Sequence, residues 1–215
     1  SVVLGFFTAF TNVMLPRMSS LLANGEKDRF QELVNRSFSV MSTCCIPLIL
    51  CSMIMAPQIV YILSGPGYEG AILPMRIIMP AAFAVGVAQV LAIQVLMPMK
   101  KDKVLLVASI IGAVVSLLIN LLVVPYIESV GSAVVLLCSE AVVTGAYLWY
   151  VLSHKLTLIS VKTIGKSVLY SLPSVVVCWG CGRWIENEFV GVGCAFLLSL
   201  FCLIYANRAY FRGLI

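Results

Sequence analysis

The sequence is poor in charge. Asp, Glu, Lys and Arg make up 11% of its 215 residues, whereas 61% are hydrophobic and the mean hydropathy is +1.07. A typical soluble domain is about 25% charged and about 45–50% apolar, and so few charges cannot cover the surface of a soluble globule. The composition therefore excludes a soluble enzyme domain, a disordered chain and a nucleic-acid-binding module. It indicates helices dissolved in a lipid bilayer.

Patterns of catalytic and metal-binding residues are also missing. The chain has a single histidine, His154, without a Cys, His or acid at ligand spacing. It has no Gly-rich phosphate loop before a Lys-Ser/Thr pair and no H-E-x-x-H motif. We therefore expect no catalytic residue, no bound metal and no cofactor, and we expect that the protein is not an enzyme.

The eight cysteines lie inside apolar runs, where free cysteine behaves as a small hydrophobic residue. Cys178 and Cys181 form a C-x-x-C pair, which is a spacing of thiol redox sites. The pair lacks the βαβ context of such sites and lies in or near a helix of membrane-spanning length. We interpret it as structural, and a redox or metal site is the less favoured alternative.

Long apolar segments dominate the chain. Seven of them approach the ~20 residues that a helix needs to cross a bilayer: 1–22, 36–63, 71–98, 104–126, 130–153, 163–185 and 189–208. None shows the alternating pattern of an outer-membrane strand. Because a helix satisfies its own backbone groups in lipid, the sequence predicts an all-α membrane protein, a polytopic bundle of about seven transmembrane helices.

Lys and Arg alternate between the connections. They gather around residues 27–36, 100–103 and 155–166 and in the tail after residue 206, whereas the other connections contain at most Arg183. Because Lys and Arg concentrate in cytoplasmic loops, we predict that these four regions are cytoplasmic. The first residue then lies outside and the C-terminus inside.

The first basic connection also has an amphipathic pattern. Phe30, Leu33 and Val34 share one face at helical spacing, with charged residues mostly elsewhere. This pattern predicts a short surface helix that links two spans along the inner leaflet. A regulatory or partner-binding role is the alternative.

Prolines interrupt two of the spans. Pro47 and Pro57 lie in 36–63, and the segment 71–98 contains three more. Proline removes a helical hydrogen bond and favours a kink, and broken helices are typical of transporters. Membrane helices are also simply richer in proline than soluble ones. The three prolines in 71–98 favour a functional bend there.

One acid lies near the middle of a span. Glu140 is about 15 Å into the segment 130–153 at 1.5 Å per residue. A charge at that depth is expensive and marks a candidate functional site. Glu140 could couple transport to protons or cations, or it could make a packing hydrogen bond in its neutral form, and both remain open.

Several other polar side chains lie within the spans. Arg17 is about one turn inside the cytoplasmic end of its segment, and Arg76 is about one turn inside the outer end of its segment. They can extend to the lipid headgroups, or they can face a cavity and bind an anionic substrate, since a guanidinium matches phosphate bidentately. Asn120, Gln89 and Gln94 are expensive against lipid and should face other helices, either as interhelical hydrogen bonds or as substrate contacts.

Four stretches in order carry a resemblance to a known family. They are FTNVMLPRMSSLLANGEKDRFQEL (10–33), GPGYEGAILPMRIIMP (65–80), QVLAIQVLMPMKKDK (89–103) and INLLVVPYIESVGSAVVLLCSE (119–140). Together they resemble the oligosaccharide flippase branch of the multidrug/oligosaccharidyl-lipid/polysaccharide superfamily. The resemblance covers about residues 5–150, and it does not reach the last two spans.

The resemblance implies two six-helix lobes around a central cavity, in a transporter of 12 or 14 helices. The chain would be its carboxy-terminal lobe, without the amino-terminal one. Residues 1–153 would supply five spans, and 154–215 would add two helices and a short cytoplasmic tail. Arg17 and Arg76 are the positions that could hold a diphosphate and its glycan. Few basic residues lie deep in these spans, which departs from the family pattern.

The implied activity is translocation of undecaprenyl-diphosphate-linked oligosaccharide across the bacterial inner membrane by alternating access, for export of polysaccharide such as the O-antigen of lipopolysaccharide. The partners would be the bilayer, the lipid-linked oligosaccharide, a glycan polymerase and glycosyltransferases, with no nucleic acid. One alternative is a cation-coupled multidrug exporter of the same superfamily, although a single buried acid argues against it. The other alternative is a non-transporting membrane scaffold of a glycan assembly complex.

Overall fold

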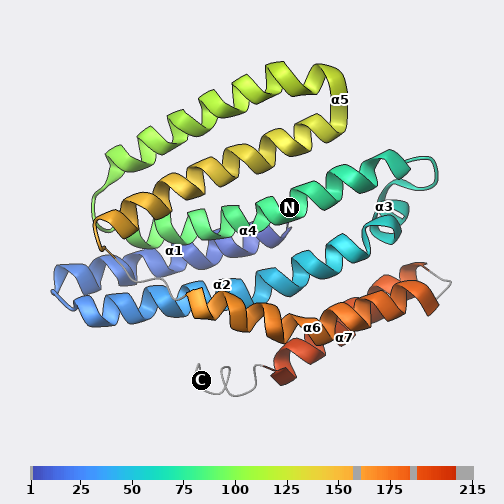
Figure 1. The fold of residues 1–215 in the computed structure, drawn as a ribbon. Helices are drawn as coiled ribbons and strands as arrows, with labels where there is room; N and C mark the ends of the chain where they lie inside the picture. The colour runs from blue at the N-terminus through green and yellow to red at the C-terminus, as the bar shows by residue number, and fades with distance from the viewer. Residues whose placement is uncertain (1, 157–160, 185–187, 207–215) are drawn as a thin grey trace.

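The computed structural model describes residues 2–156, 161–184 and 188–206, and this part of the chain is helical without a strand (Figure 1). The α-helices are α1 (Val2–Ala23), α2 (Lys27–Ile54), α3 (Ala56–Ser64), α4 (Ile72–Gln89), α5 (Asp102–Ser153), α6 (Val161–Trp184) and α7 (Glu188–Ala206). A 3-10 turn, η1 (Glu69–Ala71), precedes α4, and a π-helix, η2 (Val90–Leu96), follows it. The all-α prediction is confirmed.

The helix α5 accounts for two of the predicted spans. Its 52 residues would extend about 78 Å if straight, more than twice the ~30 Å hydrocarbon core. The backbone leaves helical geometry at Ile127 (φ −132°) and Glu128 (φ 37°). The chain reverses there, and the two arms of α5 lie side by side (Figure 1).

The remaining predicted spans correspond to α1, to α2 with α3, to η1–α4–η2, to α6 and to α7. Three of the described segments meet the length and hydropathy of a span by themselves: Lys27–Ile54, Glu69–Leu96 and Asp102–Ser153. The bundle of membrane-crossing helices is thus supported by the structure. The predicted basic tail lies outside the described residues.

The predicted surface helix is wrong. Residues 27–34 form the first two turns of α2, which continues without a break to Ile54. Phe30 and Val34 are only 2% and 1% exposed, and they begin a buried stripe that runs on through Phe38, Met41 and Cys45 at helical spacing. Because this stripe is continuous, the amphipathic turns extend the span instead of lying along the membrane surface.

Most of the prolines do not interrupt their helices. The helices α1, α2, α4 and α6 continue through Pro16, Pro47, Pro80 and Pro173. The second span is interrupted at Met55, two residues before Pro57. The third span changes to π-helix over Val90–Leu96, a feature often found at functional sites. The functional bend expected in 71–98 stays a prediction.

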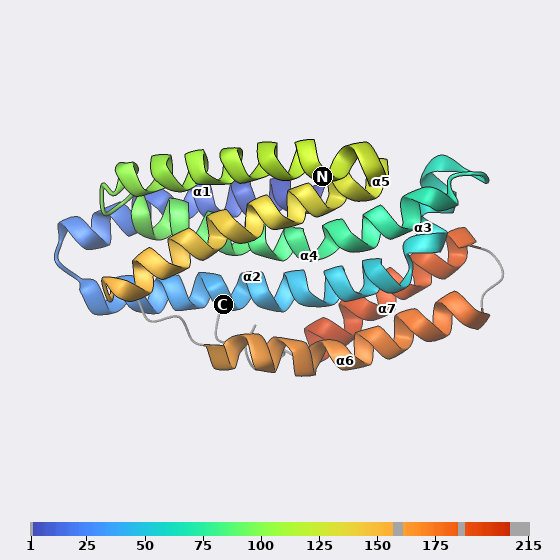
Figure 2. The same ribbon diagram turned by 45° about the horizontal axis from the view of Figure 1, so that its top comes forward.

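The helix α2 lies between two packed groups. In both Figure 1 and Figure 2, α4 lies between α5 and α2, and the α6–α7 pair lies on the other side of α2. The first core is formed by α1, α2, α4, η2 and α5, and its fully buried side chains include Met18, Leu91 and Val151. A second, smaller core joins Met55 to Cys178 of α6 and Ala195 of α7. The predicted domain boundary at residue 153 stays a prediction.

Small polar side chains connect α6 to α2, to α7 and to α3. The hydroxyls of Thr43 and Ser167 are 3.3 Å apart, and the Ser174 hydroxyl donates to the Ser199 carbonyl at 3.4 Å. Further along, the side-chain amide of Gln58 donates to the Gly182 carbonyl at 3.4 Å. Small residues and hydroxyls of this kind allow membrane helices to approach closely and to hydrogen-bond across the contact.

Candidate functional site

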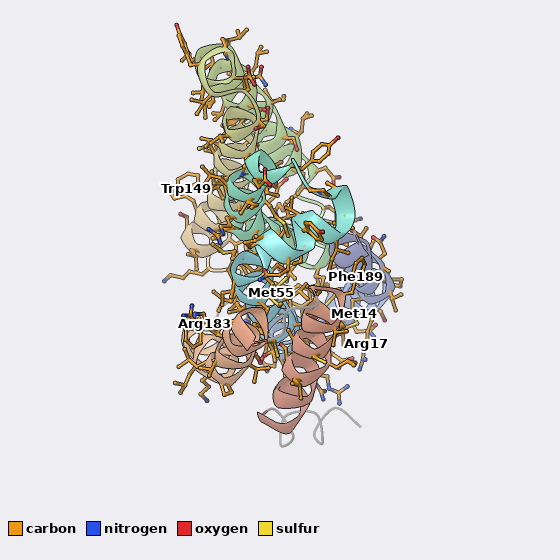
Figure 3. The ribbon with its side chains drawn as sticks, turned by 90° about the vertical axis from the view of Figure 1, so that its right-hand side faces the viewer. Met14, Arg17, Met55, Trp149, Arg183 and Phe189 are labelled. Atoms are coloured by element: carbon orange, nitrogen blue, oxygen red, sulfur yellow. The ribbon has the colours of Figure 1, made fainter. Side chains whose placement is uncertain are left out.

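The free faces of α5, α6 and α7 are apolar. Trp149 on α5 and Phe189 on α7 are both exposed, and Figure 3 shows Trp149 at the outer edge of α5. Their exposed large side chains include Leu106, Val114, Leu117, Leu121, Leu169, Val176, Phe196 and Leu197. Surfaces of this composition are solvated by lipid tails, because they contain few groups that need hydrogen bonds.

The free face of α1 has a different composition. Asn12, Arg17, Ser19 and Ser20 are exposed there, together with Val13. An amide, two hydroxyls and a guanidinium are costly against lipid tails. In Figure 3, Arg17 lies at the edge of the molecule away from Trp149. We therefore identify the polar face of α1, defined by Asn12, Arg17, Ser19 and Ser20, as the candidate functional site.

Arg17 is the cation of this face. It makes no ion pair within the described residues, where Arg29 pairs with Glu26 at 2.7 Å. An exposed guanidinium without a carboxylate can donate two parallel hydrogen bonds to a phosphate. The sequence-based assignment of Arg17 to an anionic substrate is therefore compatible with its position.

Arg76 is not part of the same site. Its Nε donates to the Met53 carbonyl at 3.1 Å, next to the end of α2. Arg17 lies within two turns of the α1–α2 connection, so the two arginines are near opposite ends of α2, roughly 30 Å apart at 1.5 Å per residue. In this conformation, Arg76 stabilises a helix end and cannot bind the same phosphate as Arg17.

The two predicted glutamines have different environments. The Gln89 side-chain amide donates to the Thr8 hydroxyl at 2.9 Å, which is the expected hydrogen bond between α4 and α1. Gln94 is 0% exposed within η2, and neither its nitrogen nor its oxygen has a partner in the described part of the chain. Gln94 therefore lacks the expected interhelical bond and is inaccessible to a substrate in this conformation.

The remaining two candidates lie on the arms of α5. Asn120 is exposed on the first arm. Glu140 is half-buried on the second arm and makes no ion pair within the described residues. The arms approach closely at this level, since a Cβ at Gly112 would overlap Val143 and lie 3.8 Å from the Ser139 carbonyl oxygen. The two residues do not meet Arg17 in a single cluster.

Sequence reasoning identified Arg17 but did not recognise the polar face of α1 as a unit. Its signal was the spacing of Asn12, Arg17 and Ser20, which recur along one side of an otherwise apolar run. Metal chemistry has no support in the described residues, where His, Cys, Asp and Glu form no group of three that could hold an ion. Cys178 is buried in the second core, which fits the structural interpretation of the C-x-x-C pair.

Comparisons with known proteins add independent information. Residues 3–200 match the family model described as "Lipid II flippase MurJ". A curated protein of Escherichia coli (strain K12), named "Putative O-antigen transporter", is 29% identical over 153 residues, which is 71% of this chain and 36% of that protein.

The fold has a solved counterpart. A structure titled "Lipid II flippase MurJ, inward closed conformation" matches 99% of this chain and 45% of its own, with a TM-score of 0.81 and 14% identity. At that identity, the likeness shows the fold alone. The chain spans less than half the length of each of these two proteins.

Proposed function

The chain belongs to the MurJ family of lipid II flippases, and from this premise we propose that it forms the carboxy-terminal part of a transporter for a lipid-linked oligosaccharide. The proposed substrate is an undecaprenyl-diphosphate-linked oligosaccharide, and the proposed location is the bacterial inner membrane. The similar proteins are named as flippases and a transporter, in agreement with the expectation that the chain is not an enzyme.

The polar face of α1 is the observation that supports this proposal. A lipid-linked oligosaccharide has a charged, hydrated head and an apolar tail, so its carrier needs a polar path through lipid-facing helices. The α1 face offers such a path, with Arg17 as a phosphate ligand. The head would cross along this face while the polyprenyl tail remains in the bilayer.

The arrangement of the connections supports the proposed orientation. The α1–α2 turn, the α4–α5 connection and the end of α5 lie at one end of the bundle, and the α5 reversal lies at the other (Figure 1). Lys27, Lys101 and Lys155 thus share an end. By the excess of Lys and Arg, this end is cytoplasmic, and Arg17 is near the leaflet in which the substrate is made.

A flipping assay tests the proposal. The full-length protein is reconstituted in vesicles with a fluorescent lipid-linked oligosaccharide, and the rate of its appearance in the other leaflet is measured. We expect Arg17→Ala to slow transport by about tenfold, the size of one lost charge-assisted hydrogen bond. The charge-preserving variant Arg17→Lys should be less affected.

The matched control is Arg29→Ala, because Arg29 is exposed near the same end and its ion pair is a weak surface contact. If Arg17→Ala and Arg29→Ala slow transport equally, Arg17 is not a specific ligand of the substrate. Transport of cationic dyes instead of the lipid-linked sugar would favour a multidrug exporter. Stoichiometric capture of a polymerase or glycosyltransferase, with no transport, would favour a scaffold.

Glu140 is the proposed ion-coupling residue. A cation can drive transport only if it binds the inward and outward states with different affinity. A half-buried carboxyl at the close approach of the two α5 arms can differ between such states. We expect Glu140→Gln to transport without dependence on an imposed ion gradient, whereas Glu128→Gln, at the exposed reversal of α5, should retain the dependence. Unchanged gradient dependence in Glu140→Gln would exclude its role.

A further inference from the structure

The open end of the α5 hairpin contains a groove that the proposed function does not use. Its volume is about 330 Å³, within the range of about 300–1,000 Å³ typical of ligand sites. The first arm contributes Lys103, Val104, Val107, Ala108 and Ile111, and the second contributes Ala146, Trp149 and Tyr150. The groove therefore runs between the two arms, from the end of the hairpin toward the middle of the spans.

The groove is apolar along its length and cationic at its mouth. Aliphatic side chains and Trp149 form the walls, and Lys103 stands at the end. Lys103 is exposed and makes no ion pair within the described residues, and Lys100 and Lys101 are next to it with Asp102 as the nearest acid in sequence. The mouth thus has an excess of positive charge that no carboxylate of the described chain neutralises.

The dimensions and the aromatic residues fit a lipid at the membrane surface. From Lys103 to Ile111 the first arm rises about 12 Å, so the groove extends from headgroup depth into the hydrocarbon. Trp149 is 70% exposed, as interfacial Trp residues are. The Tyr150 ring is held by stacking on His154, with 4.1 Å between ring centroids.

We propose that this groove binds one acyl chain of an anionic glycerophospholipid, with the lipid phosphate at Lys103. The site goes beyond the proposed transport function, since it requires only that α5 lie in a bilayer. Trp149 is on the other side of the molecule from Arg17 (Figure 3), so the groove is separate from the polar face of α1. A phospholipid of the surrounding leaflet is the occupant that reaches this side without crossing the protein.

In the test, the full-length protein is released from lipid nanodiscs, and native mass spectrometry measures how much of each lipid it retains. The probes are phosphatidylglycerol, zwitterionic phosphatidylethanolamine and undecaprenyl phosphate at equal concentration. We expect about fivefold preferential retention of phosphatidylglycerol over phosphatidylethanolamine, the size expected from one Lys at a membrane surface. Lys103→Gln should abolish that preference, and Lys103→Arg should keep it.

Three further variants separate the contribution of the headgroup from that of the acyl chain. Ala146→Phe fills the groove and should lower retention of both phospholipids, whereas Ala141→Phe, at an exposed position on the same arm, should not. Lys166→Gln, at an exposed lysine on α6, should leave the preference unchanged. Equal retention of the two phospholipids, or an unaltered preference in Lys103→Gln, would overturn the proposal. Displacement of phosphatidylglycerol by undecaprenyl phosphate would overturn it as well and would assign the groove to the carrier lipid.

Discussion

Gln94 places an amide in the first core with neither polar atom hydrogen-bonded within the described part of the chain. An unsatisfied buried polar group costs about 1–3 kcal/mol, whereas an apolar group of similar shape avoids that cost. We therefore expect Gln94→Leu to stabilise the full-length protein by about 1–3 kcal/mol. Thermal unfolding in detergent measures the change.

Gln89→Leu is the matched control, because Gln89 does hydrogen-bond to Thr8. Its loss should destabilise the protein by about 0.6 kcal/mol, the average for a hydrogen bond between membrane helices. A destabilised Gln94→Leu variant would contradict the prediction and would show that the amide has a partner in the complete protein.

Residue environments could be predicted only in part from sequence. The bond of Gln89 to another helix was predictable, because an amide in a membrane span needs a partner. The lack of a bond at Gln94 and the exposure of Asn120 were not predictable, since both depend on which helices pack against these positions. The location of Arg17 and Arg76 at opposite ends of the bundle was predictable, because Arg17 lies near a basic connection and Arg76 near a connection without Lys or Arg.

Among the helices, α5 depends most clearly on a glycine. A Cβ at Gly112 would overlap the Val143 side chain of the other arm. We expect Gly112→Leu to force the arms apart and to destabilise the protein by about 1–3 kcal/mol, as overpacking does. Thermal unfolding of the full-length protein measures this.

Gly145→Leu on the second arm is the control, because a Cβ at Gly145 meets nothing within 4 Å. The double variant Gly112→Ala/Val143→Ala should be more stable than Gly112→Leu, because it lacks the Val143 methyl group that a Cβ at position 112 would overlap. Equal stability of Gly112→Leu and Gly145→Leu would show that the arms do not approach as closely as described.

At the scale of elements, hydropathy located the spans well because apolar length decides which segments enter lipid. It failed at the start of α2, where the charged residues around Phe30 and Val34 concealed a buried stripe. Proline content does not by itself mark where a helix ends, because α2 and α4 continue through Pro47 and Pro80. Neighbouring helices can compensate for a proline within the membrane.

At the scale of the whole molecule, the predicted orientation in the membrane determines from which face each connection can be labelled. We expect Lys27→Cys and Lys101→Cys to react with a membrane-impermeant maleimide from one face only, and Tyr68→Cys and Ser129→Cys from the other. All four positions are exposed, at connections on opposite ends of the bundle. Labelling of intact and permeabilised cells that express the full-length protein distinguishes the faces.

The unsubstituted protein is the control, because its described cysteines are buried or half-buried and should react little. Reaction of Lys27→Cys and Lys101→Cys from opposite faces would contradict both the helix count and the orientation.

The helix α2 contributes side chains to both hydrophobic cores, from Phe30 to Ile49 in the first and through Met55 at its end in the second. A single helix thus connects the first core, which contains Met18 of α1, to the α6–α7 pair on its other side (Figure 2). Because both cores are built on this one helix, any tilt of α2 would displace α1 and the α6–α7 pair together, so the two flanks of the molecule are mechanically coupled.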